Sequence, residues 1–307
     1  MHIVVIGGTG FIGRHLCNKL LERGDTVVVL SRSPSKAAEL FPRGAMCFRW
    51  KSEKYSEWLH AIEPDCAIVN LAGANIAAGR WNSKRRVAII NSRVETGQAL
   101  ARGLQSTKIR PEVIVQGSAI GYYGHNDNPV DEESPKGTGF LSDVVERWEN
   151  AGASTIKELG IRRAILRTGM VVGNGGALTK MLPPFRKGLG GPIGKGTQGV
   201  SWVHVEDEVR AIIHLIDNKA SQGVYNITSP GAINSKELAQ ALGSVLKRPA
   251  FLPVPGFFLK LLYGQMADEL LLSGQFVIPK RLHAEGFTFN YEDISAALAD
   301  AIRQIER

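Results

Sequence analysis

Hydrophobic positions near the start of the chain alternate between short apolar runs and helical spacing. Ile3-Val4-Val5-Ile6 is rich in β-branched residues and short enough to be a fully buried strand. Apolar residues then recur at every fourth position from Ile12 to Leu20, in a helical pattern that stops at Gly24. A second β-branched run, Val27-Val28-Val29-Leu30, follows. The pattern predicts a strand, a glycine turn, a helix and a second strand.

The rest of the chain repeats this alternation. Apolar runs predict further strands over 45–48, 65–73, 113–116, 162–167 and 224–227. Helical spacing predicts helices between them, over 55–62, 83–105, 141–160, 181–185, 212–216 and 238–246. In the longest helix we expect an inward face made of Val87, Ile90, Val94, Leu100 and Leu104. Strands that alternate with helices indicate a parallel sheet covered by helices on both faces.

The two ends of the chain differ in organisation. Residues 1–248 carry the alternating elements and predict a Rossmann-type, doubly wound α/β domain. After about residue 173 this domain is expected to contain insertions that form a substrate lobe. The stretch 173–198 is dense in glycine and proline, which is typical of a lid with Lys195 and Gln198 as polar contacts, or of a plain linker. Residues 249–307 are expected to form a smaller C-terminal α/β lobe.

Glycines in the first turn supply the geometry that a dinucleotide pyrophosphate requires. Glycine permits a tight turn, a close approach of backbone to phosphate, and close packing of the helix against the strand. The helix N-terminus that follows offers free N–H groups and a positive dipole end. The predicted cofactor contacts in this turn are Gly7, Thr9, Gly10, Phe11, Ile12 and Gly13. The alternative is a tight turn that binds nothing.

The end of the second predicted strand favours NADP(H) over NAD. NAD-binding chains carry an acidic residue about 20 positions after the turn, where it accepts a hydrogen bond from the ribose 2′-OH. This chain has Leu30-Ser31-Arg32-Ser33-Pro34 at that point, without a carboxylate. The Arg32 guanidinium and the Ser31 hydroxyl can instead hold a 2′-phosphate. The alternative for Arg32 is a solvated surface cation.

Two later segments can complete the cofactor site. A buried strand ends in the small residues of Asn70-Leu71-Ala72-Gly73, and ligands of open α/β sheets lie across this edge. Leu71, Ala72 and Gly73 are therefore predicted cofactor contacts. Arg93, in the middle of the longest predicted helix, can turn toward the cofactor phosphates or ribose, or it can be an exposed surface charge.

Composition and charge limit the alternatives. A formal net charge of +8 suits an anionic cofactor, and no basic tract of the nucleic-acid-binding kind is present, Lys84-Arg85-Arg86 being the densest cluster. Cys17, Cys47 and Cys66 lack the spacing of a metal or redox site and predict free, buried thiols in a reducing compartment. Neither a signal peptide nor a membrane-spanning run is apparent. We therefore expect a cytoplasmic protein without metal, membrane or nucleic-acid partners.

These motifs resemble the extended, nucleotide-sugar-epimerase-like short-chain dehydrogenases/reductases. Further matching motifs are Ser118 to Gly124, Leu166-Arg167-Thr168-Gly169 and Val203-His204-Val205-Glu206-Asp207. More narrowly, the chain is similar to the atypical family that includes member 39U of the superfamily and bacterial epimerase family proteins. That similarity rests on Gly188 to Gly194 running to Trp202-Val203-His204, and on Val277 to Leu282 running to Gly286-Phe287.

The resemblance implies an NADP(H)-binding Rossmann domain with a smaller C-terminal lobe. It implies hydride transfer between nicotinamide and a carbonyl carbon of a small-molecule substrate whose identity stays open. In the superfamily a tyrosine serves as the acid or base, a lysine four residues later lowers its pKa, and a serine on a strand end fixes the substrate oxygen. Relatives in the family have also been associated with bacterial and plastid division.

The catalytic pair of the superfamily is missing from this chain. None of the six tyrosines has a lysine four positions later, and Phe140-Leu141-Ser142-Asp143-Val144 occupies the expected slot. Ser118 matches the superfamily's serine, while Tyr122 or Tyr123 could reach the nicotinamide and His204 could act as an acid near neutral pH. The alternatives are aromatic packing at a strand end and a hydrogen-bonded structural histidine.

Two functions therefore stay open. The first is an NADP(H)-dependent oxidoreductase or epimerase-like enzyme with a non-standard acid. The second is a non-catalytic NADP(H)-binding protein that reports redox state or docks a partner.

Overall fold

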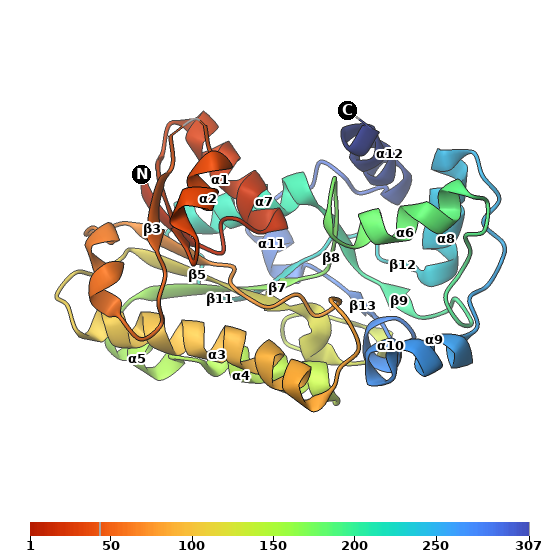
Figure 1. Ribbon diagram of the computed structural model, residues 1–307, viewed down its shortest axis with the longest axis horizontal. Helices are drawn as coiled ribbons and strands as arrows, with labels where there is room; N and C mark the ends of the chain where they lie inside the picture. Colours follow the sequence, from red (N-terminus) through yellow and green to blue (C-terminus); the bar gives the residue numbers. More distant parts are fainter. Residues whose placement is uncertain (43, 307) are drawn as a thin grey trace.

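A parallel seven-stranded sheet forms the centre of the molecule. Its strands are β1 (His2–Ile6), β2 (Thr26–Ser31), β3 (Met46–Arg49), β4 (Ala67–Asn70), β5 (Val113–Ala119), β7 (Arg162–Thr168) and β11 (Gly223–Ile227). The computed structural model describes residues 1–42 and 44–306 (Figure 1). The strand order is β11-β7-β5-β4-β1-β2-β3, with every neighbouring pair parallel. The chain thus winds outward in both directions from β1 and β4, which confirms the doubly wound fold.

Helices cover both faces of the sheet (Figure 1). One face carries α1 (Phe11–Arg23), α2 (Pro34–Glu39), α7 (Val205–Asp217) and α11 (Lys280–Ala284), and the other α3 (Ser83–Gln105), α4 (Phe140–Asn150) and α5 (Ala153–Glu158). Successive residues point to opposite faces of a strand, so Val5 is buried with α1 while Val4 is buried with α3. Burial on both faces explains why these strands are continuous apolar runs.

A second lobe combines segments from several parts of the chain. Its main helices are α6 (Gly176–Arg186), α8 (Ser235–Leu246) and α12 (Ile294–Glu306), whose apolar side chains share one core. Two small sheets join it, β8 (Met170–Val172) with β10 (Trp202–His204) and β9 (Gly199–Val200) with β12 (Ile233–Asn234). Leu242 before the predicted boundary at residue 248 packs in the same core as Leu298 after it. The smaller lobe is present, and its core crosses that predicted boundary.

The remaining elements connect the two lobes. They are β6 (Asn126–Val130) paired with β13 (Gln275–Val277), the 3-10 turn η3 (Ile120–Tyr123), and the short helices α9 (Gly256–Tyr263) and α10 (Gln265–Leu270). The sequence contains no signal for β6, because Asn-Asp-Asn-Pro-Val lacks alternating apolar residues. Within the described ranges, no helix combines the length and the apolar character needed to cross a membrane.

The predicted helix over 55–62 is wrong. The residues form two 3-10 turns, η1 (Tyr55–Glu57) and η2 (Leu59–Ala61), because Trp58 leaves the helical region with φ of −133°. Its buried ring lies against α3, where a Cβ on Gly103 would come within 2.5 Å of it. Its indole N–H donates to the Lys51 carbonyl at 3.1 Å. Burial of one large ring therefore sets the backbone of the segment.

Two details of the predicted helices also need correction. Val87 is 54% exposed, and Ile89 is buried in its place against Trp81 and Phe140, so the inner stripe of α3 is rotated at its start. The helix predicted over 141–160 is interrupted between α4 and α5 at Gly152, which has φ of +75°. A Cβ at Gly152 would lie 2.6 Å from the Ala101 Cβ, so the break lets the chain pass close to α3.

Candidate functional site

The glycine turn joins β1 to α1 at the carboxyl edge of the sheet. The Gly10 amide donates to the Gly7 carbonyl at 3.0 Å, and Gly7 has φ of +86°, a conformation that favours glycine. A Cβ on Gly7 would lie 2.8 Å from the backbone carbon of Leu71. A Cβ on Gly13 would lie 2.4 Å from the Gly7 oxygen. Both glycines are therefore required by close contacts of the turn with α1 and with the end of β4.

The N-terminus of α1 is open to an anion. Gly10 is the N-cap and offers no side-chain cap, and the first turn contains no acidic residue. Thr9 and Gly10 are exposed, while Ile12 is half-buried and packs against the core. Free N–H groups and the positive end of the helix dipole are the elements that bind phosphate at such termini.

Phe11 connects the turn to the second lobe. A Cβ on Gly173 would lie 2.8 Å from the Phe11 ring, and one on Gly175 would lie 2.7 Å from it. In the next helical turn, His15 Nε2 lies 2.9 Å from the Asn174 Oδ1. The glycines at the start of the predicted lid therefore make room for Phe11.

Ser31 and Arg32 lie at the same edge, one strand over. Leu30 pairs with Ile6 in the β1–β2 register, so Arg32 stands two residues beyond the level at which β1 ends. Its side chain is exposed. The Ser31 hydroxyl accepts a hydrogen bond from the Ser33 amide at 3.2 Å. Both residues therefore lie at the same edge of the sheet as the glycine turn.

The segment after β4 lies beside the turn and is held from below by α3. Leu71 donates its amide to the Ile6 carbonyl at 2.8 Å, and the Ala72 amide donates to Asn70 Oδ1 at 3.2 Å. A Cβ on Gly73 would lie 3.1 Å from the Arg93 guanidinium carbon, so only glycine leaves the backbone this close to the cation.

Arg93 is not the exposed surface charge that the sequence left open. Its guanidinium donates to the carbonyls of Ala74 at 3.2 Å and Ile89 at 3.0 Å, and it lies 4.8 Å from the Trp148 ring. Burial lowers the pKa of Arg93 to about 10. Ser92, which the sequence did not single out as a site residue, accepts a hydrogen bond from the Ala74 amide at 2.9 Å. Together the two side chains fix the backbone at Gly73.

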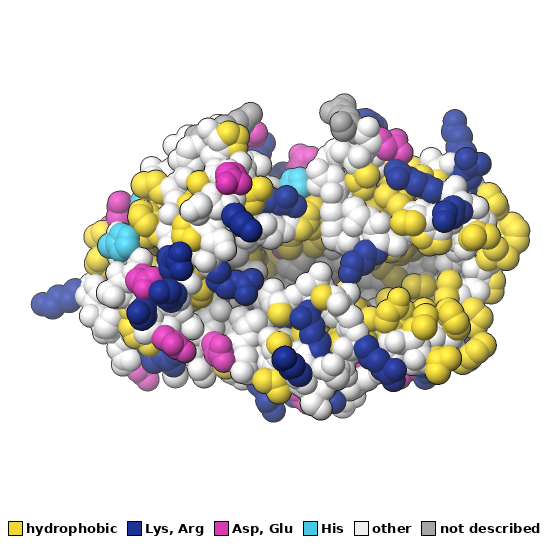
Figure 2. Space-filling model, in the orientation of Figure 1, with side chains coloured by type: hydrophobic (Ala, Val, Ile, Leu, Met, Phe, Trp, Pro, Cys, Tyr) yellow, Lys and Arg dark blue, Asp and Glu magenta, His cyan; other side chains and the backbone are white. Residues whose placement is uncertain are grey.

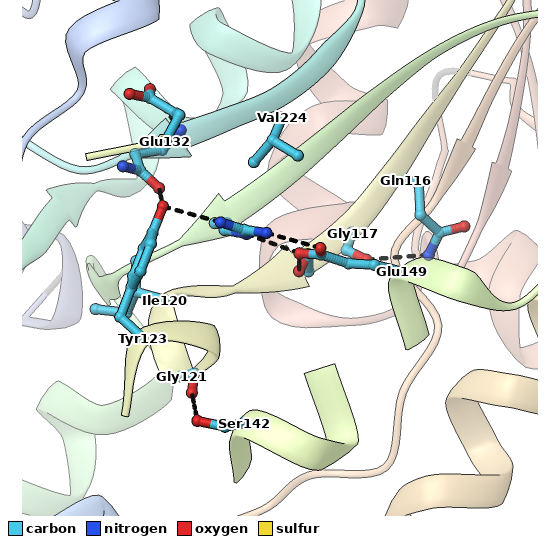
Figure 3. Close-up of polar contacts among 12 residues, drawn as sticks. Gln116, Gly117, Ile120, Gly121, Tyr123, Glu132, Ser142, Glu149 and Val224 are labelled. Atoms are coloured by element: carbon cyan, nitrogen blue, oxygen red, sulfur yellow. Dashed lines mark hydrogen bonds and ion pairs between the residues drawn. The ribbon is translucent and has the colours of Figure 1, made fainter. Parts of the chain in front are cut away.

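Ser118 lies in a buried charged network. Its hydroxyl donates to Glu149 Oε1 at 2.6 Å, and the Glu149 carboxylate is bound by Arg167 through two hydrogen bonds of 2.8 and 2.9 Å. Figure 3 shows Glu149 beside the β-strand that carries Gln116 and Gly117. The hydrogen bonds and charge of Glu149 outweigh burial and hold the pKa of Arg167 above its usual range. The Ser118 hydroxyl is thus already engaged by a carboxylate.

Tyr122 and Tyr123 pack on the other side of Arg167. The Tyr123 hydroxyl donates to Asn226 Oδ1 at 2.7 Å and accepts from Arg167 at 3.1 Å (Figure 3). Burial raises the pKa of Tyr123 to about 12, which makes it a poor proton donor. Tyr122 is half-buried, and the Arg167 guanidinium lies 3.4 Å from its ring centroid. In the sequence, only Arg167 pointed to this network, because it lies in the motif Leu166-Arg167-Thr168-Gly169. Nothing in the sequence singled out Glu149.

His204 is fully buried and caps α7. Its Nδ1 accepts a hydrogen bond from the Glu206 amide at 3.3 Å, its Nε2 lies 3.4 Å from Asp300 Oδ2, and its ring stacks on Tyr291 at 3.9 Å. Burial lowers the pKa of His204 despite the nearby carboxylates. This is the arrangement of a structural histidine, the alternative to a catalytic acid that the sequence left open.

Apolar side chains fill the slot of the missing catalytic pair. Phe140 and Val144 are buried with Trp81, Ile89 and Met266. Phe140 makes an edge contact with the Trp81 ring at 5.1 Å. Neither side chain can carry a proton, so the structure supplies no tyrosine or lysine at this position.

The start of α4 is closed by the C-terminal lobe. Glu269, on α10, accepts hydrogen bonds from the backbone amides of Phe140 at 3.1 Å and Leu141 at 2.8 Å. The Ser142 hydroxyl donates to the Gly121 carbonyl at 3.0 Å (Figure 3). The sequence contains no signal for Glu269, because the contact spans 129 residues of the chain.

The predicted polar lid residues have different surroundings. Gln198 is buried, and its amide donates to the carbonyls of Ile193 at 3.1 Å and Leu271 at 2.8 Å, so it holds the lobe together. Lys195 is exposed. The expectation that Gln198 contacts a substrate is therefore corrected: its donors are used within the protein.

The profile described as NAD dependent epimerase/dehydratase family matches residues 3–228. The chain belongs to this family. A second profile, described as Domain of unknown function (DUF1731), matches residues 254–301 in the C-terminal lobe. These matches confirm the resemblance to the epimerase-like short-chain dehydrogenases/reductases.

Members of the epimerase family align with nearly the whole chain. The epimerase family protein SDR39U1 homolog, chloroplastic, of Arabidopsis thaliana is 39% identical over 302 residues, which cover 97% of this chain and 86% of the relative. The crystal structure of human epimerase family protein SDR39U1 (isoform2) with NADPH has a TM-score of 0.87 at 35% identity and covers 99% of both chains. The Thermus thermophilus UDP-glucose 4-epimerase complex with NAD has a TM-score of 0.80 at 19% identity, covers 100% of this chain and 99% of its own, and shows the shared fold.

Proposed function

We propose that the protein binds NADP(H) across the carboxyl ends of β1, β2 and β4, with Arg32 and Ser31 holding the 2′-phosphate. The observation that carries the proposal is the exposed Arg32 beside the glycine turn, on a strand end without a carboxylate. The turn fits the pyrophosphate, because the N-terminus of α1 has no side-chain cap and no acidic residue in its first turn. The human relative, whose structure contains NADPH, supports the same ligand.

Small adenosine ligands isolate the contribution of the 2′-phosphate. We expect adenosine 2′,5′-bisphosphate to bind more tightly than adenosine 5′-monophosphate, by about tenfold for one charge-assisted contact. Calorimetric titration of both ligands against the wild type and Arg32→Ala tests this. Equal affinities in the wild type would refute the role of Arg32.

For the chemical step, we propose an NADP(H)-dependent oxidoreductase or epimerase-like enzyme that acts on a small molecule through Tyr122. Of the four candidate residues, Ser118 donates to Glu149, Tyr123 donates to Asn226, and His204 caps a helix. Tyr122 is half-buried, and its hydroxyl forms no hydrogen bond within the described residues. It is therefore the candidate whose proton is free for a substrate. When bound, the nicotinamide would donate the hydride in its reduced form or accept it in its oxidised form.

A non-catalytic role is the second candidate function. Phe140 and Val144 fill the slot with apolar side chains, which favours a non-catalytic role. The tyrosine that acts as the acid in the superfamily and the lysine that lowers its pKa are both absent from the slot. In this role NADP(H) would control binding to a partner, for example one in cell division. Turnover of NADPH with a panel of aldehydes, ketones and nucleotide sugars separates the candidates. Turnover that Tyr122→Phe abolishes supports the enzyme, and its absence supports the binding protein.

We place the protein in the cytoplasm. Cys17 and Cys66 are buried free thiols, and burial raises their pKa values to about 12 and about 11. Inert free thiols are typical of a reducing compartment. Fractionation of the source cells with an antibody to the protein tests the location.

A further inference from the structure

An open groove lies along α8, at the opposite end of the molecule from α1 (Figure 1). It encloses about 510 Å³ and is lined by Lys236, Gln240, Ser244, Lys247, Arg248 and Phe251, among others. The side chains come from one face of α8 and from the segment that follows it. None of them belongs to the cofactor edge, so the groove needs an explanation of its own.

The cations of the groove have no counterions. Within the part of the chain that the structure describes, the side chains of Lys236, Lys247 and Arg248 form neither an ion pair nor a hydrogen bond, and all three are exposed. Some lysines elsewhere are neutralised, as Lys136 is by Asp143 and Glu146, both at 2.8 Å. What sets the groove apart is that it gathers three unpaired cations on one concave surface. Unpaired positive charge that lines a concave surface raises the local concentration of anionic groups. The groove is thus suited to an acidic ligand.

Apolar side chains continue the surface from the rim of the groove. Phe251 lines the groove with 73% of its surface exposed. The chain then runs directly into α9, where Phe257 is 75% and Leu261 is 70% exposed one helical turn apart. Figure 2 shows apolar side chains gathered over the region of α9, with basic side chains nearby. An apolar patch with a basic rim is typical of an interaction site.

We infer that the α8 groove and α9 bind an acidic, amphipathic segment of a partner protein. Carboxylates of the segment would pair with Lys236, Lys247 and Arg248, while its apolar side chains cover Phe251 and α9. A second copy joined symmetrically through this surface would bring like charges together. A flat bilayer would leave a concave groove of about 510 Å³ unfilled. The groove, its positive charge and its apolar rim together therefore favour a peptide segment over a second copy of the chain or a bilayer.

The experiment is selection of peptides on the full-length protein from a phage-displayed random dodecapeptide library. The recovered peptides are then titrated by fluorescence anisotropy. We expect peptides rich in Asp or Glu with Leu, Phe or Trp, and at least tenfold weaker binding to the variant Lys236→Glu/Lys247→Glu/Arg248→Glu. Phe251→Ser should weaken binding less, and added salt should weaken it for the wild type.

A matched control separates the groove from net charge. Lys54→Glu/Lys108→Glu/Lys157→Glu reverses three exposed lysines that do not line the groove, so it changes the net charge equally and should leave peptide affinity unchanged. Failure to enrich any peptide, or equal weakening by both triple variants, would overturn the inference. So would self-association in sedimentation velocity, or binding to vesicles of phosphatidylcholine and phosphatidylglycerol, that only the groove variant abolishes.

Discussion

The cofactor edge, at the ends of β1, β2 and β4, and the slot of the usual catalytic pair, on α4, are built in opposite ways. At the cofactor edge, the turn is built of glycines, and Arg32, just after β2, is exposed and forms no hydrogen bond or ion pair within the described residues. In the slot, Phe140 and Val144 are packed among apolar side chains, and near the end of β5 the Ser118 hydroxyl is bound to Glu149. The cofactor edge has groups available to a ligand. In and beside the slot, the side chains are packed or hydrogen-bonded to other residues of the protein. We therefore expect that changes in one region leave the other intact.

The largest expected effect lies in the buried network beside the slot. Glu149→Ala would leave Arg167 buried without its carboxylate partner, which costs about 3–5 kcal/mol of folding stability. Urea unfolding measures the loss. The control is Glu149→Met combined with Arg167→Met, which replaces the pair by apolar groups and should recover most of it. A loss under about 1 kcal/mol for the single variant would contradict the importance of this pair.

Adding a side chain to the glycine turn should weaken cofactor binding at the other region, the cofactor edge. In Gly13→Val the new Cβ would meet the Gly7 oxygen at 2.4 Å, and the displaced turn should lose about 3 kcal/mol, roughly 100-fold, in NADPH affinity. Calorimetric titration measures it, with circular dichroism to verify folding. The control is Gly24→Ala at the other end of α1. Its φ of +88° makes this change costly in stability, but no atom lies within 4 Å of the added carbon, so NADPH affinity should match that of the wild type.

Restoring the superfamily's tyrosine and lysine in the slot tests whether the slot and the cofactor edge are independent. Phe140→Tyr with Val144→Lys rebuilds the superfamily motif but places an ammonium among Trp81, Ile89 and Met266, at a cost of about 2 kcal/mol in stability. NADPH affinity should stay unchanged, because neither residue belongs to the turn. Thermal unfolding and cofactor titration on the same samples check both statements. A gain of stability would show that the slot is not packed as described.

Glu208 should make folding stability depend on pH, and it lies outside both the cofactor edge and the slot. It is fully buried on α7 beside Thr168, and burial raises its pKa from 4.5 to about 8. Between these values the folded protein holds a proton that the unfolded chain has lost, so stability falls as pH rises, by up to about 1.4 kcal/mol per pH unit. Glu208→Gln should flatten this slope in unfolding measured between about pH 5 and pH 8. The exposed Glu206→Gln should not.

The sequence predicts the first strand–turn–helix–strand unit well, because its elements depend on residues that are close together in the chain. Strand, turn and helix follow one another from His2 to Ser31, and the turn glycines are consecutive in the chain. The bounds of α3 were also predicted, since a long periodic pattern is decisive. Failures came where one distant contact decides the local backbone, as Trp58 does against Gly103 and Gly152 against Ala101.

For the candidate site, the sequence predicted chemical groups but not the residues that surround them. The sequence suggested Ser118, Tyr122 and His204 as chemical groups but could not show their partners. Glu149 lies 31 residues from Ser118, and Asp300 lies 96 residues from His204, so no spacing rule connects them. Partner identity depends on packing between lobes, which a single sequence does not reveal.

The most direct test of NADP(H) recognition is calorimetric titration of NADPH and NADH against the wild type, Arg32→Ala and the remote control Lys157→Ala. We expect the wild type and Lys157→Ala to bind NADPH at least about tenfold more tightly than NADH, and Arg32→Ala to bind the two equally. Equal binding of both cofactors by the wild type, or a preference that survives in Arg32→Ala, would contradict the assignment of the 2′-phosphate to Arg32.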